Sequence, residues 1–303
     1  MTAVSVVVPT WNRATWLDGC LDALATQALP PEEVIVVGRD GDPRARTIAE
    51  AHRERGLPVR WVGGARPGHV EPIRRGLASV TSELVAFVDD DVVPDERWLE
   101  ELVACLDEPR VACVGGRVVT PGFRGAIHAD AGSIRWYGRH IGNIGAVEAP
   151  APREVVAVME GNCAWRTEVL RQLEFDARLD SDDASMYGLD LSLQAVDRGY
   201  RVVYTSAARV EVVPAPRDPA LDREDRVARA FTYNRNYTLI GLRRFRGIRR
   251  WVFPVWWVIV GERGGYGLVT GALDLVVRGR STWPLVRRSF RGKWEGFRLW
   301  AGR

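Results

Sequence analysis

The chain of 303 residues has few of the side chains that build metal centres and disulfide scaffolds. It has four cysteines, at positions 20, 105, 113 and 163, and no two of them have the C-x-x-C spacing of a zinc or redox site. Its four histidines show no metal-ligand spacing either. Three of the cysteines lie in apolar segments, which indicates buried free thiols in a reducing compartment. The sequence therefore predicts a cytoplasmic location.

Two further signatures are missing from the sequence. It contains neither G-x-x-x-x-G-K-[S/T] nor G-x-G-x-x-G, so a P-loop or a Rossmann dinucleotide site would lack its phosphate cradle. No window reaches the ~18 apolar residues of a membrane-spanning helix. The run W-V-F-P-V-W-W-V-I-V has only ten residues. These absences argue against a dinucleotide enzyme and against a transmembrane helix.

Lysine is nearly absent from the sequence, and the positive charge is unevenly distributed along the chain. Lys293 is the single lysine, so nearly all positive charge comes from arginine. Residues 241–303 hold 14 Lys and Arg against 3 Asp and Glu, a net charge of +11, whereas residues 1–240 carry a net charge of −8. Such an asymmetry indicates an anionic partner for the tail, such as a membrane surface or a polyanion.

The first part of the chain alternates short β-branched runs with segments of helical periodicity. The predicted strands are Val4–Pro9, Glu33–Val37, Val59–Val62, Leu84–Val88 and Val111–Gly115. The predicted helices are Ala14–Thr26, Arg44–Arg55, Pro72–Val80 and Asp95–Leu106, and a further helix (Leu191–Asp197) and strand (Tyr200–Thr205) follow an irregular region. This order predicts an α/β fold with a mostly parallel sheet, in which ligands bind at the carboxyl ends of the strands.

Three consecutive carboxylates stand at one of those strand ends. The stretch L-V-A-F-V-D-D-D-V-V-P places Asp89, Asp90 and Asp91 directly after a buried strand. Adjacent carboxylates repel one another, so a divalent cation or sugar hydroxyls would explain them. The alternative is an acidic turn that caps the next helix, but Asp95 suffices as a cap. The triplet therefore favours a ligand site.

Four segments in combination resemble the family 2 glycosyltransferases. They are V-S-V-V-V-P-T-W-N-R, E-V-I-V-V, F-V-D-D-D and D-L-S-L-Q-A-V-D-R-G-Y-R-V, and the similarity spans residues 4–215. The resemblance implies a GT-A fold, with a Rossmann-like, mostly parallel sheet flanked by helices. It also implies transfer of a sugar from a nucleotide-diphosphate donor to a hydroxyl acceptor, with inversion and with Mg²⁺ or Mn²⁺.

The resemblance also assigns roles to individual residues. It implies nucleotide-sugar contacts at Pro9, Thr10, Asn12, Arg13, Asp40, Arg74, Asp89, Asp90, Gly161 and Asn162. It implies that Asp91 ligates the metal that bridges the two phosphates. Asp40 matches the family pattern with a shift of one residue, and Asp42 is the alternative. Arg74 stands where the family often has an asparagine.

Two positions depart from the family pattern. The usual acidic pair before the D-L-S-L helix is replaced by Tyr187 and Gly188, so the resemblance leaves Asp190 as the catalytic base, with Asp183 as second choice. The alternative for Asp190 is a helix cap. Where the family often offers a histidine to the metal, this chain has Val212. Its neighbour Glu211 points to the opposite face of a strand.

The tail from residue 226 is predicted to form a basic helical region after a catalytic domain over residues 1–225. Six of the twelve tryptophans lie after residue 250, beside arginines. Such a tail is typical of a segment at the lipid–water boundary, and equally of helices packed on the catalytic body. If the tail lies at the lipid–water boundary, we expect the protein at the inner face of the cell membrane and a lipid-linked acceptor. The alternative acceptor is a natural-product or polysaccharide intermediate. No module favours nucleic-acid binding.

Two other functions remain as alternatives. A nucleotidyltransferase shares carboxylate–metal chemistry beside a parallel sheet, but it usually needs a glycine-rich basic loop after the first strand, and P-T-W-N-R is not one. A degenerate transferase fold that binds a nucleotide or tethers a partner at the membrane would explain the missing acidic pair and the missing histidine.

Overall fold

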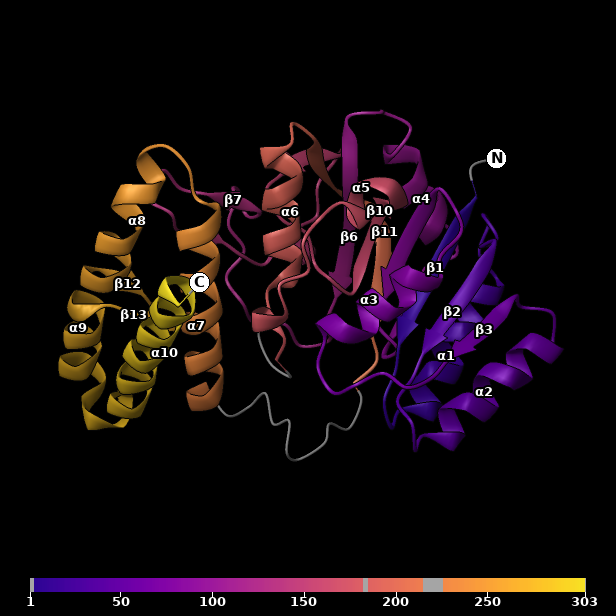
Figure 1. Cartoon of the computed structure of the whole chain (residues 1–303), viewed down its shortest axis with the longest axis horizontal. Coiled ribbons are helices and arrows are strands. Elements are labelled where there is room, and N and C mark those ends of the chain that lie inside the picture. The colour runs from indigo at the N-terminus through magenta and orange to yellow at the C-terminus, as the bar shows by residue number, and fades with distance from the viewer. Residues whose placement is uncertain (1–2, 182–184, 215–225, 303) are drawn as a thin grey trace. The chain divides into compact units, whose positions relative to one another are not determined.

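The described residues form two compact units. A computed structural model describes residues 3–181, 185–214 and 226–302 (Figure 1). Unit 1 consists of Met1–Ser133, Ile141–Phe175 and Leu191–Pro216, and unit 2 of Ile134–His140, Asp176–Asp190 and Arg217–Arg303. The division into domains 1–225 and 226–303 stays a prediction. The two units differ from it mainly because residues 134–140 and 176–190 group with the C-terminal helices.

Nine described strands of unit 1 form one sheet. Their order is β3-β2-β1-β4-β10-β6-β11-β5, and β9 also pairs with β11. The strands are β1 (Val4–Pro9), β2 (Glu33–Val37), β3 (Val59–Val62), β4 (Leu84–Val88), β5 (Val92–Pro94), β6 (Val111–Val119), β9 (Arg153–Val155), β10 (Asn162–Arg166) and β11 (Arg201–Val212). The first four strands run parallel and so do β6 and β11, whereas β10 lies antiparallel between β4 and β6. The predicted mostly parallel sheet is confirmed.

Helices cover both faces of this sheet. They are α1 (Ala14–Ala25), α2 (Pro43–Glu54), α3 (Val70–Ser79), α4 (Trp98–Cys105) and α5 (Thr167–Arg171), and α6 (Tyr187–Asp197) begins in unit 2 and ends in unit 1. Val6 and Val8 of β1 belong to the core that includes Leu17 of α1. Val7 points to the other face, where Gly76 of α3 lies against it. Because β1 is buried on both faces, its sequence is apolar apart from the buried Ser5.

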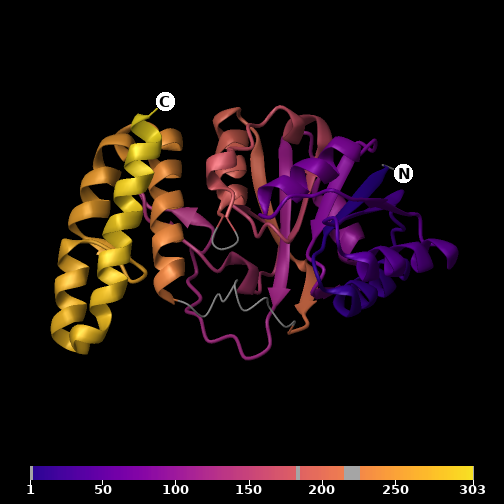
Figure 2. The same ribbon diagram turned by 60° about the horizontal axis from the view of Figure 1, so that its bottom comes forward.

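The described residues of unit 2 contain four long helices. They are α7 (Arg226–Arg244), α8 (Ile248–Ile259), α9 (Leu268–Arg278) and α10 (Trp283–Ala301), with a short hairpin of β12 (Gly261–Glu262) and β13 (Gly265–Tyr266) between α8 and α9. Helices α7 and α10 lie side by side (Figures 1 and 2). A Cβ at Gly292 or Gly296 of α10 would come within 2.4 Å of α7 backbone oxygens, so only glycine permits this approach.

The remaining elements are short. A two-stranded sheet joins β7 (Ser133–Ile134) to β8 (His140–Ile141), and 3₁₀ turns lie at Ile144–Ala146, Ala177–Leu179 and Gly279–Thr282. β7, β8 and the turn at Ile144–Ala146 lie in the irregular region that the sequence predicts between Thr120 and Leu191.

Most predicted elements of unit 1 have the expected type and position. Four strands have the predicted bounds, namely Val4–Pro9, Glu33–Val37, Val59–Val62 and Leu84–Val88. Strands β6 and β11 extend further than predicted. The antiparallel strand β10 is an element that the sequence analysis did not predict as a strand. All four cysteines are free, as expected.

Candidate functional site

Strand ends meet at one edge of the sheet in unit 1. The register pairs Pro9 of β1 with Val37 of β2, and Val7 of β1 with Phe87 of β4. The residues that follow these strands therefore lie at the same level. This edge collects the Thr10–Arg13 segment, the turn after β2 and the aspartate triplet, as the sequence predicts.

The triplet is tied to the segment after β1 by short polar contacts. The hydroxyl of Thr10 donates to Oδ2 of Asp90 at 2.7 Å. The Nη1 atom of Arg13 lies 3.0 Å from Oδ1 of Asp90 and 3.0 Å from Oδ2 of Asp91. One guanidinium thus pairs with two adjacent carboxylates, and four of the predicted site residues form a single cluster.

Burial makes this cluster electrostatically unusual. Asp90 is 4% exposed. Desolvation raises the pKa of Asp90 to about 7, although Arg13 and Thr10 act in the opposite direction. Burial lowers the pKa of Arg13, but the charges of Asp90 and Asp91 outweigh it and raise that pKa above its ordinary value. Strongly perturbed groups at a strand edge are typical of a functional site.

Asp89 takes a different position from its two neighbours. Its side chain is exposed, and its backbone N–H donates to the carbonyl of Gly161 at 3.2 Å. A Cβ at Gly161 would lie 2.0 Å from Oδ2 of Asp89, so a larger residue here would displace this carboxylate from its present position. The structure thus brings Gly161 to the triplet, as predicted.

The side chain of Asn162 makes hydrogen bonds that stabilise the fold. It is fully buried, and its Oδ1 accepts a hydrogen bond from Nε1 of Trp98 at 2.7 Å. Its Nδ2 donates to the backbone carbonyls of Arg117 and Ala208. These bonds fix the first residue of β10 against α4 and the neighbouring strands. Asn162 therefore holds Gly161 in place from within the sheet.

The two candidate aspartates after β2 have distinct surroundings. Asp42 is buried and accepts from the backbone N–H groups of Asn12 at 2.7 Å and Ala45 at 3.2 Å, so it caps α2 and fixes the loop after β1. Asp40 is exposed, and its carboxylate lies close to Gly63 at the end of β3. This difference favours Asp40 as the ligand-binding residue of the two.

The remaining predicted contacts lie around the same edge. Asn12 adopts a left-handed backbone conformation with φ of 55°, which asparagine tolerates, and its side chain is exposed. Pro9 is half-buried at the end of β1. Arg74 is exposed on α3, a helix that packs against β1 and β2.

The end of β11 reaches Asp91 through the backbone. The N–H of Val213 donates to the carbonyl of Asp91 at 2.8 Å, and Val212 pairs with Val92. The position at which the resemblance expects a histidine is therefore next to the triplet. Glu211 is instead exposed and forms an ion pair with Arg209 at 2.9 Å.

Asp190 belongs to unit 2 and has an arginine partner. It is 1% exposed and lies in the first turn of α6, inside the helix rather than before it. Arg244 of α7 donates from Nε to Oδ1 at 2.7 Å and from Nη2 to Oδ2 at 2.9 Å. No motif marks this pair, whose two residues are 54 positions apart in the chain. Asp183 lies outside the described residues.

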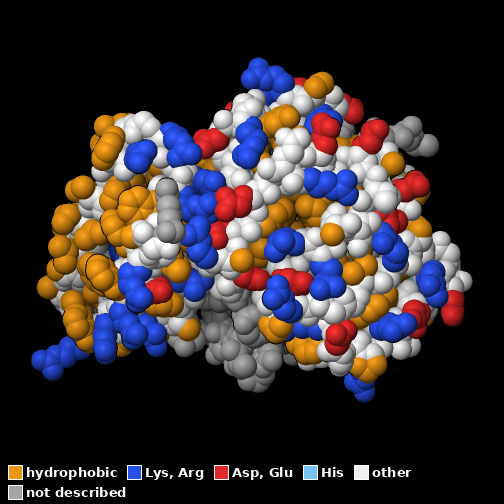
Figure 3. All heavy atoms as spheres, in the orientation of Figure 1, with side chains coloured by type: hydrophobic (Ala, Val, Ile, Leu, Met, Phe, Trp, Pro, Cys, Tyr) orange, Lys and Arg blue, Asp and Glu red, His pale blue; other side chains and the backbone are white. Residues whose placement is uncertain are grey.

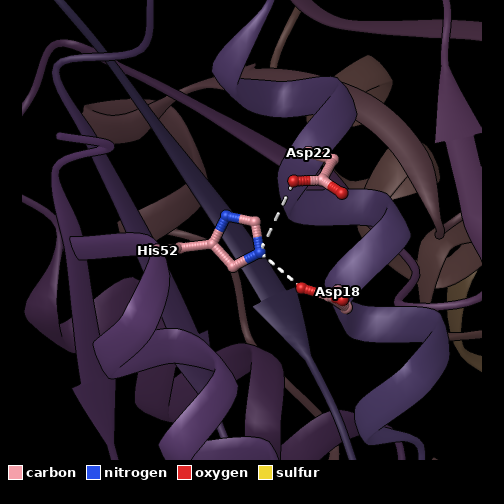
Figure 4. A group of neighbouring side chains, drawn as sticks. All are labelled: Asp18, Asp22 and His52. Atoms are coloured by element: carbon pink, nitrogen blue, oxygen red, sulfur yellow. Dashed lines mark hydrogen bonds and ion pairs between the residues drawn. The ribbon is translucent and has the colours of Figure 1, made fainter. Parts of the chain in front are cut away.

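A second acidic cluster lies between α1 and α2. Nε2 of His52 lies 2.8 Å from Oδ1 of Asp18 and 3.8 Å from Oδ1 of Asp22 (Figure 4). His52 belongs to the polar segment predicted as the helix Arg44–Arg55, yet it is 2% exposed. Arg55 also lies within 3.5 Å of both carboxylates and balances their charge. We interpret the cluster as a contact that joins the two helices.

The triplet has the donors that a hard divalent cation requires. Asp91 is partly accessible, with a side chain 13% exposed, and offers carboxylate oxygen beside Asp90. Mg²⁺ and Mn²⁺ prefer such oxygen ligands and accept few protein carboxylates when phosphates and water complete the shell. These residues therefore fit a divalent cation. Arg13 would compete with the cation, because its guanidinium already contacts the carboxylates of Asp90 and Asp91.

Residues 5–148 match the family model described as "Glycosyl transferase family 2". Glycosyltransferase AglE of Haloferax volcanii is 30% identical over 121 residues, which cover 38% of this chain and 39% of that protein. The chain thus matches well under two thirds of the length of this curated relative.

Solved structures extend the likeness to the whole chain at the level of the fold. Mannosyltransferase PcManGT from Pyrobaculum calidifontis, in complex with GDP-Man and Mn²⁺, has a TM-score of 0.62 at 18% identity, covering 100% of this chain and 88% of that one. S. aureus TarS 1–349, in complex with UDP-GlcNAc, has a TM-score of 0.62 at 16% identity, covering 95% and 79%. The sheet, the flanking helices and the helical C-terminal region are those of a GT-A fold.

Proposed function

Because residues 5–148 match the model of glycosyl transferase family 2, we propose that the protein transfers a sugar from a nucleotide-diphosphate donor to a hydroxyl acceptor. The observation that carries this proposal is the cluster of Thr10, Arg13, Asp90 and Asp91 at the carboxyl edge of the sheet. This is the edge at which parallel α/β sheets bind their ligands.

The donor would lie along this edge. Asp40, exposed at the end of β2, would contact the nucleotide, with Pro9, Asn12 and Arg74 beside it. Asp89 and Asp90 would contact the ribose and the sugar, next to the space that Gly161 leaves open. Thr10 and Arg13 would hold Asp90 in place, and Arg13 could turn from the carboxylates to the diphosphate.

Asp91 would hold a divalent metal, either Mg²⁺ or Mn²⁺. A bound cation supplies charge neutralisation and Lewis acidity to a diphosphate leaving group. Arg13 already stabilises negative charge at this position, since it donates to Asp90 and Asp91. The backbone bond from Val213 would keep Asp91 aligned with the end of β11.

The acceptor hydroxyl needs a base, and Asp190 is the proposed one. A positioned carboxylate contributes roughly 10²–10⁴-fold to such a reaction. Direct displacement at the anomeric carbon would invert its configuration. In the structure Arg244 occupies both oxygens of Asp190, so catalysis would require this pair to open toward the acceptor.

The acceptor and the location are proposed from the tail. Arginine and exposed aromatic side chains on unit 2 favour a lipid-linked acceptor over a soluble natural-product or polysaccharide intermediate. We place the protein in the cytoplasm, peripherally at the inner face of the cell membrane.

A non-catalytic role is the second candidate. The closed Asp190–Arg244 pair and the residues Tyr187 and Gly188 at the start of α6 favour a degenerate fold that binds a nucleotide without turnover. It makes the opposite prediction for product release.

The test is to incubate the full chain with a panel of nucleotide sugars and Mg²⁺ or Mn²⁺, and to follow nucleoside diphosphate release together with nucleotide binding. Diphosphate release that falls at least about 10²-fold in Asp91→Asn supports transfer. Asp95→Asn is the matched control, because Asp95 pairs with Arg209. Binding without release favours the non-catalytic fold, and pyrophosphate formation indicates a nucleotidyltransferase. If the chain neither binds the nucleotide nor releases diphosphate, the proposal is overturned.

A variant separates the base from the fold. Asp190→Asn should lose diphosphate release while it still binds the nucleotide and keeps its circular dichroism spectrum. Full turnover by a folded Asp190→Asn protein would remove Asp190 as the base.

A further inference from the structure

Helix α9 is built with its apolar side outward. Its exposed residues are Leu268, Val269, Ala272, Leu273, Val276 and Val277, and Val276 and Val277 are 84% and 76% exposed. Its buried residues are Gly271 and Asp274. A helix that faces water normally turns its apolar stripe to the core and its charges to the solvent. Hydrophobic burial alone would therefore orient α9 the other way.

Polar contacts hold α9 in this orientation. The hydroxyl of Tyr266 donates to Oδ2 of Asp274 at 3.0 Å. The side chains of Arg263 and Arg278 lie 3.8 and 3.6 Å from the same carboxylate. Asp274 is 6% exposed, so its charge is compensated inside unit 2. The outward apolar face is thus a fixed feature of the packing.

Helix α8 adds a second apolar stripe. Ile248, Trp251, Val255 and Ile259 recur at helical spacing and are 62%, 72%, 64% and 44% exposed. The opposite side of the helix carries the fully buried Phe253 and Trp257. Figure 3 shows hydrophobic side chains gathered over both helices in one view. We call these ten exposed residues of the two helices the α8–α9 face. Monomeric soluble proteins rarely show an apolar surface of this extent.

Exposed arginines lie on the two helices of the α8–α9 face and on the segments that follow them. The exposed arginines of the loops and helix ends beside it are Arg250, Arg263, Arg278 and Arg280, and α10 adds Arg287, Arg288 and Arg291. The three acidic residues of the described part of 241–302 offset only part of this charge. Arg263 and Arg278 share the carboxylate of Asp274, and Glu262 and Glu295 are paired with Arg139 and Arg298. The surface therefore combines apolar side chains with a net positive charge.

We infer that the α8–α9 face lies on an anionic lipid surface, with its apolar side chains among the acyl chains and its arginines at the headgroups. Charge decides between the candidate occupants. A second copy would bring the same arginines face to face in a symmetric dimer, which is repulsive. Anionic lipids would neutralise them. Within the described residues no helix is long and apolar enough to cross a bilayer, so the helices lie on the membrane.

This inference rests on the proposed membrane location but not on sugar transfer, so lipid binding is measured without any nucleotide. The full chain is floated with vesicles of phosphatidylcholine alone and of phosphatidylcholine with phosphatidylglycerol. Binding to the anionic vesicles should exceed binding to the neutral ones at least tenfold and should weaken as salt rises. The double variant Val276→Ser and Val277→Ser should lose at least tenfold in binding.

The matched control is the double variant Phe123→Ser and Ile127→Ser, two residues of unit 1 that are 44% and 54% exposed. It should bind vesicles as the unchanged chain does. Equal binding by neutral and anionic vesicles, or equal binding by the Val276 and Val277 variant, overturns the inference. The inference is also overturned if the unchanged chain sediments as a dimer, the Val276 and Val277 variant sediments as a monomer, and the chain does not bind vesicles. Diphosphate release without lipid tests the transferase separately.

Discussion

Arg244 holds Asp190 by two parallel hydrogen bonds, from Nε to Oδ1 at 2.7 Å and from Nη2 to Oδ2 at 2.9 Å. Bidentate pairs of this kind are among the stronger polar contacts in proteins. Asp190 is 1% exposed, so the carboxylate is removed from water as well as paired. If Asp190 acts as the proposed base, the guanidinium must move away before the carboxylate can reach an acceptor hydroxyl.

We expect Arg244→Met to destabilise the protein by about 3–5 kcal/mol, because it removes a positive charge and two hydrogen bonds from the buried Asp190 carboxylate. Urea denaturation measures this change. Arg298→Met is the control, since Arg298 is an exposed partner of Glu295 at 3.4 Å and such a pair contributes about 1 kcal/mol or less. Equal effects of the two substitutions would show that Asp190 is not dependent on Arg244.

Arg13 and a divalent cation should compete for the same carboxylate oxygens. In Arg13→Gln, Asp90 and Asp91 lose the guanidinium that lies 3.0 Å from each. We expect a lower Tm without metal and a larger increase in Tm on adding Mn²⁺ than in the unchanged chain, because the ion stabilises the folded state to which it binds. Differential scanning calorimetry measures both values without any turnover.

Arg39→Gln serves as the control for Arg13, since Arg39 lies over the ring of Trp11 at 5.0 Å. It should leave the response to Mn²⁺ unchanged. If Mn²⁺ raised the Tm of Arg13→Gln and of the unchanged chain equally, the competition would be disproved.

Gly161→Ala should weaken donor binding with little loss of stability. The new Cβ would lie 2.0 Å from Oδ2 of Asp89, and the exposed end of that side chain can move aside. Isothermal titration with the preferred nucleotide sugar should show a raised Kd at a nearly unchanged Tm. Gly19→Ala, inside α1 with nothing within 4 Å, is the control and should stabilise the helix by up to about 1 kcal/mol. If Gly161→Ala bound the donor with unchanged affinity, Asp89 would not be a donor contact.

Lys293 should make the stability of unit 2 depend on pH. Burial lowers its pKa from 10.5 to about 7, although its Nζ donates to the carbonyls of Trp257, Gly265 and Tyr266. Between these two pKa values the unfolded chain binds more protons than the folded chain. The free energy of unfolding contributed by Lys293 therefore rises with pH from about 7 to about 10.

The variant Lys293→Met isolates this effect. The difference in free energy of unfolding between the unchanged chain and Lys293→Met should shift in favour of the unchanged chain as pH rises through that window. Urea denaturation at several pH values measures it. A difference that stays constant with pH would contradict the lowered pKa.

Local patterns carried most of what the sequence could predict. The strand ending at Val88 and the three aspartates after it are adjacent in the chain, so the apolar run and the carboxylates predict the edge site together. The contact of Arg13 with Asp90 joins residues far apart in sequence, but both follow parallel strands, and that topology brings them to one level.

Long-range pairings were beyond such reasoning. Arg244 is separated from Asp190 by 54 residues and carries no motif. His52 lies in a polar segment, and only the packing of α2 on α1 buries it against Asp18. Periodicity also could not tell which way α9 faces, because an apolar stripe looks the same whether it meets a core or a membrane.

The glycines of α10 limit how this part of the chain can change in evolution. Gly292 and Gly296 meet α7 at Phe231 and Arg235, where backbone touches backbone. Inserting one residue just before Gly292 would turn both glycines by about 100° around the helix and bring bulky side chains against α7. Homologous chains can therefore gain residues in the hairpin between α8 and α9, but they should keep an unchanged register within α10.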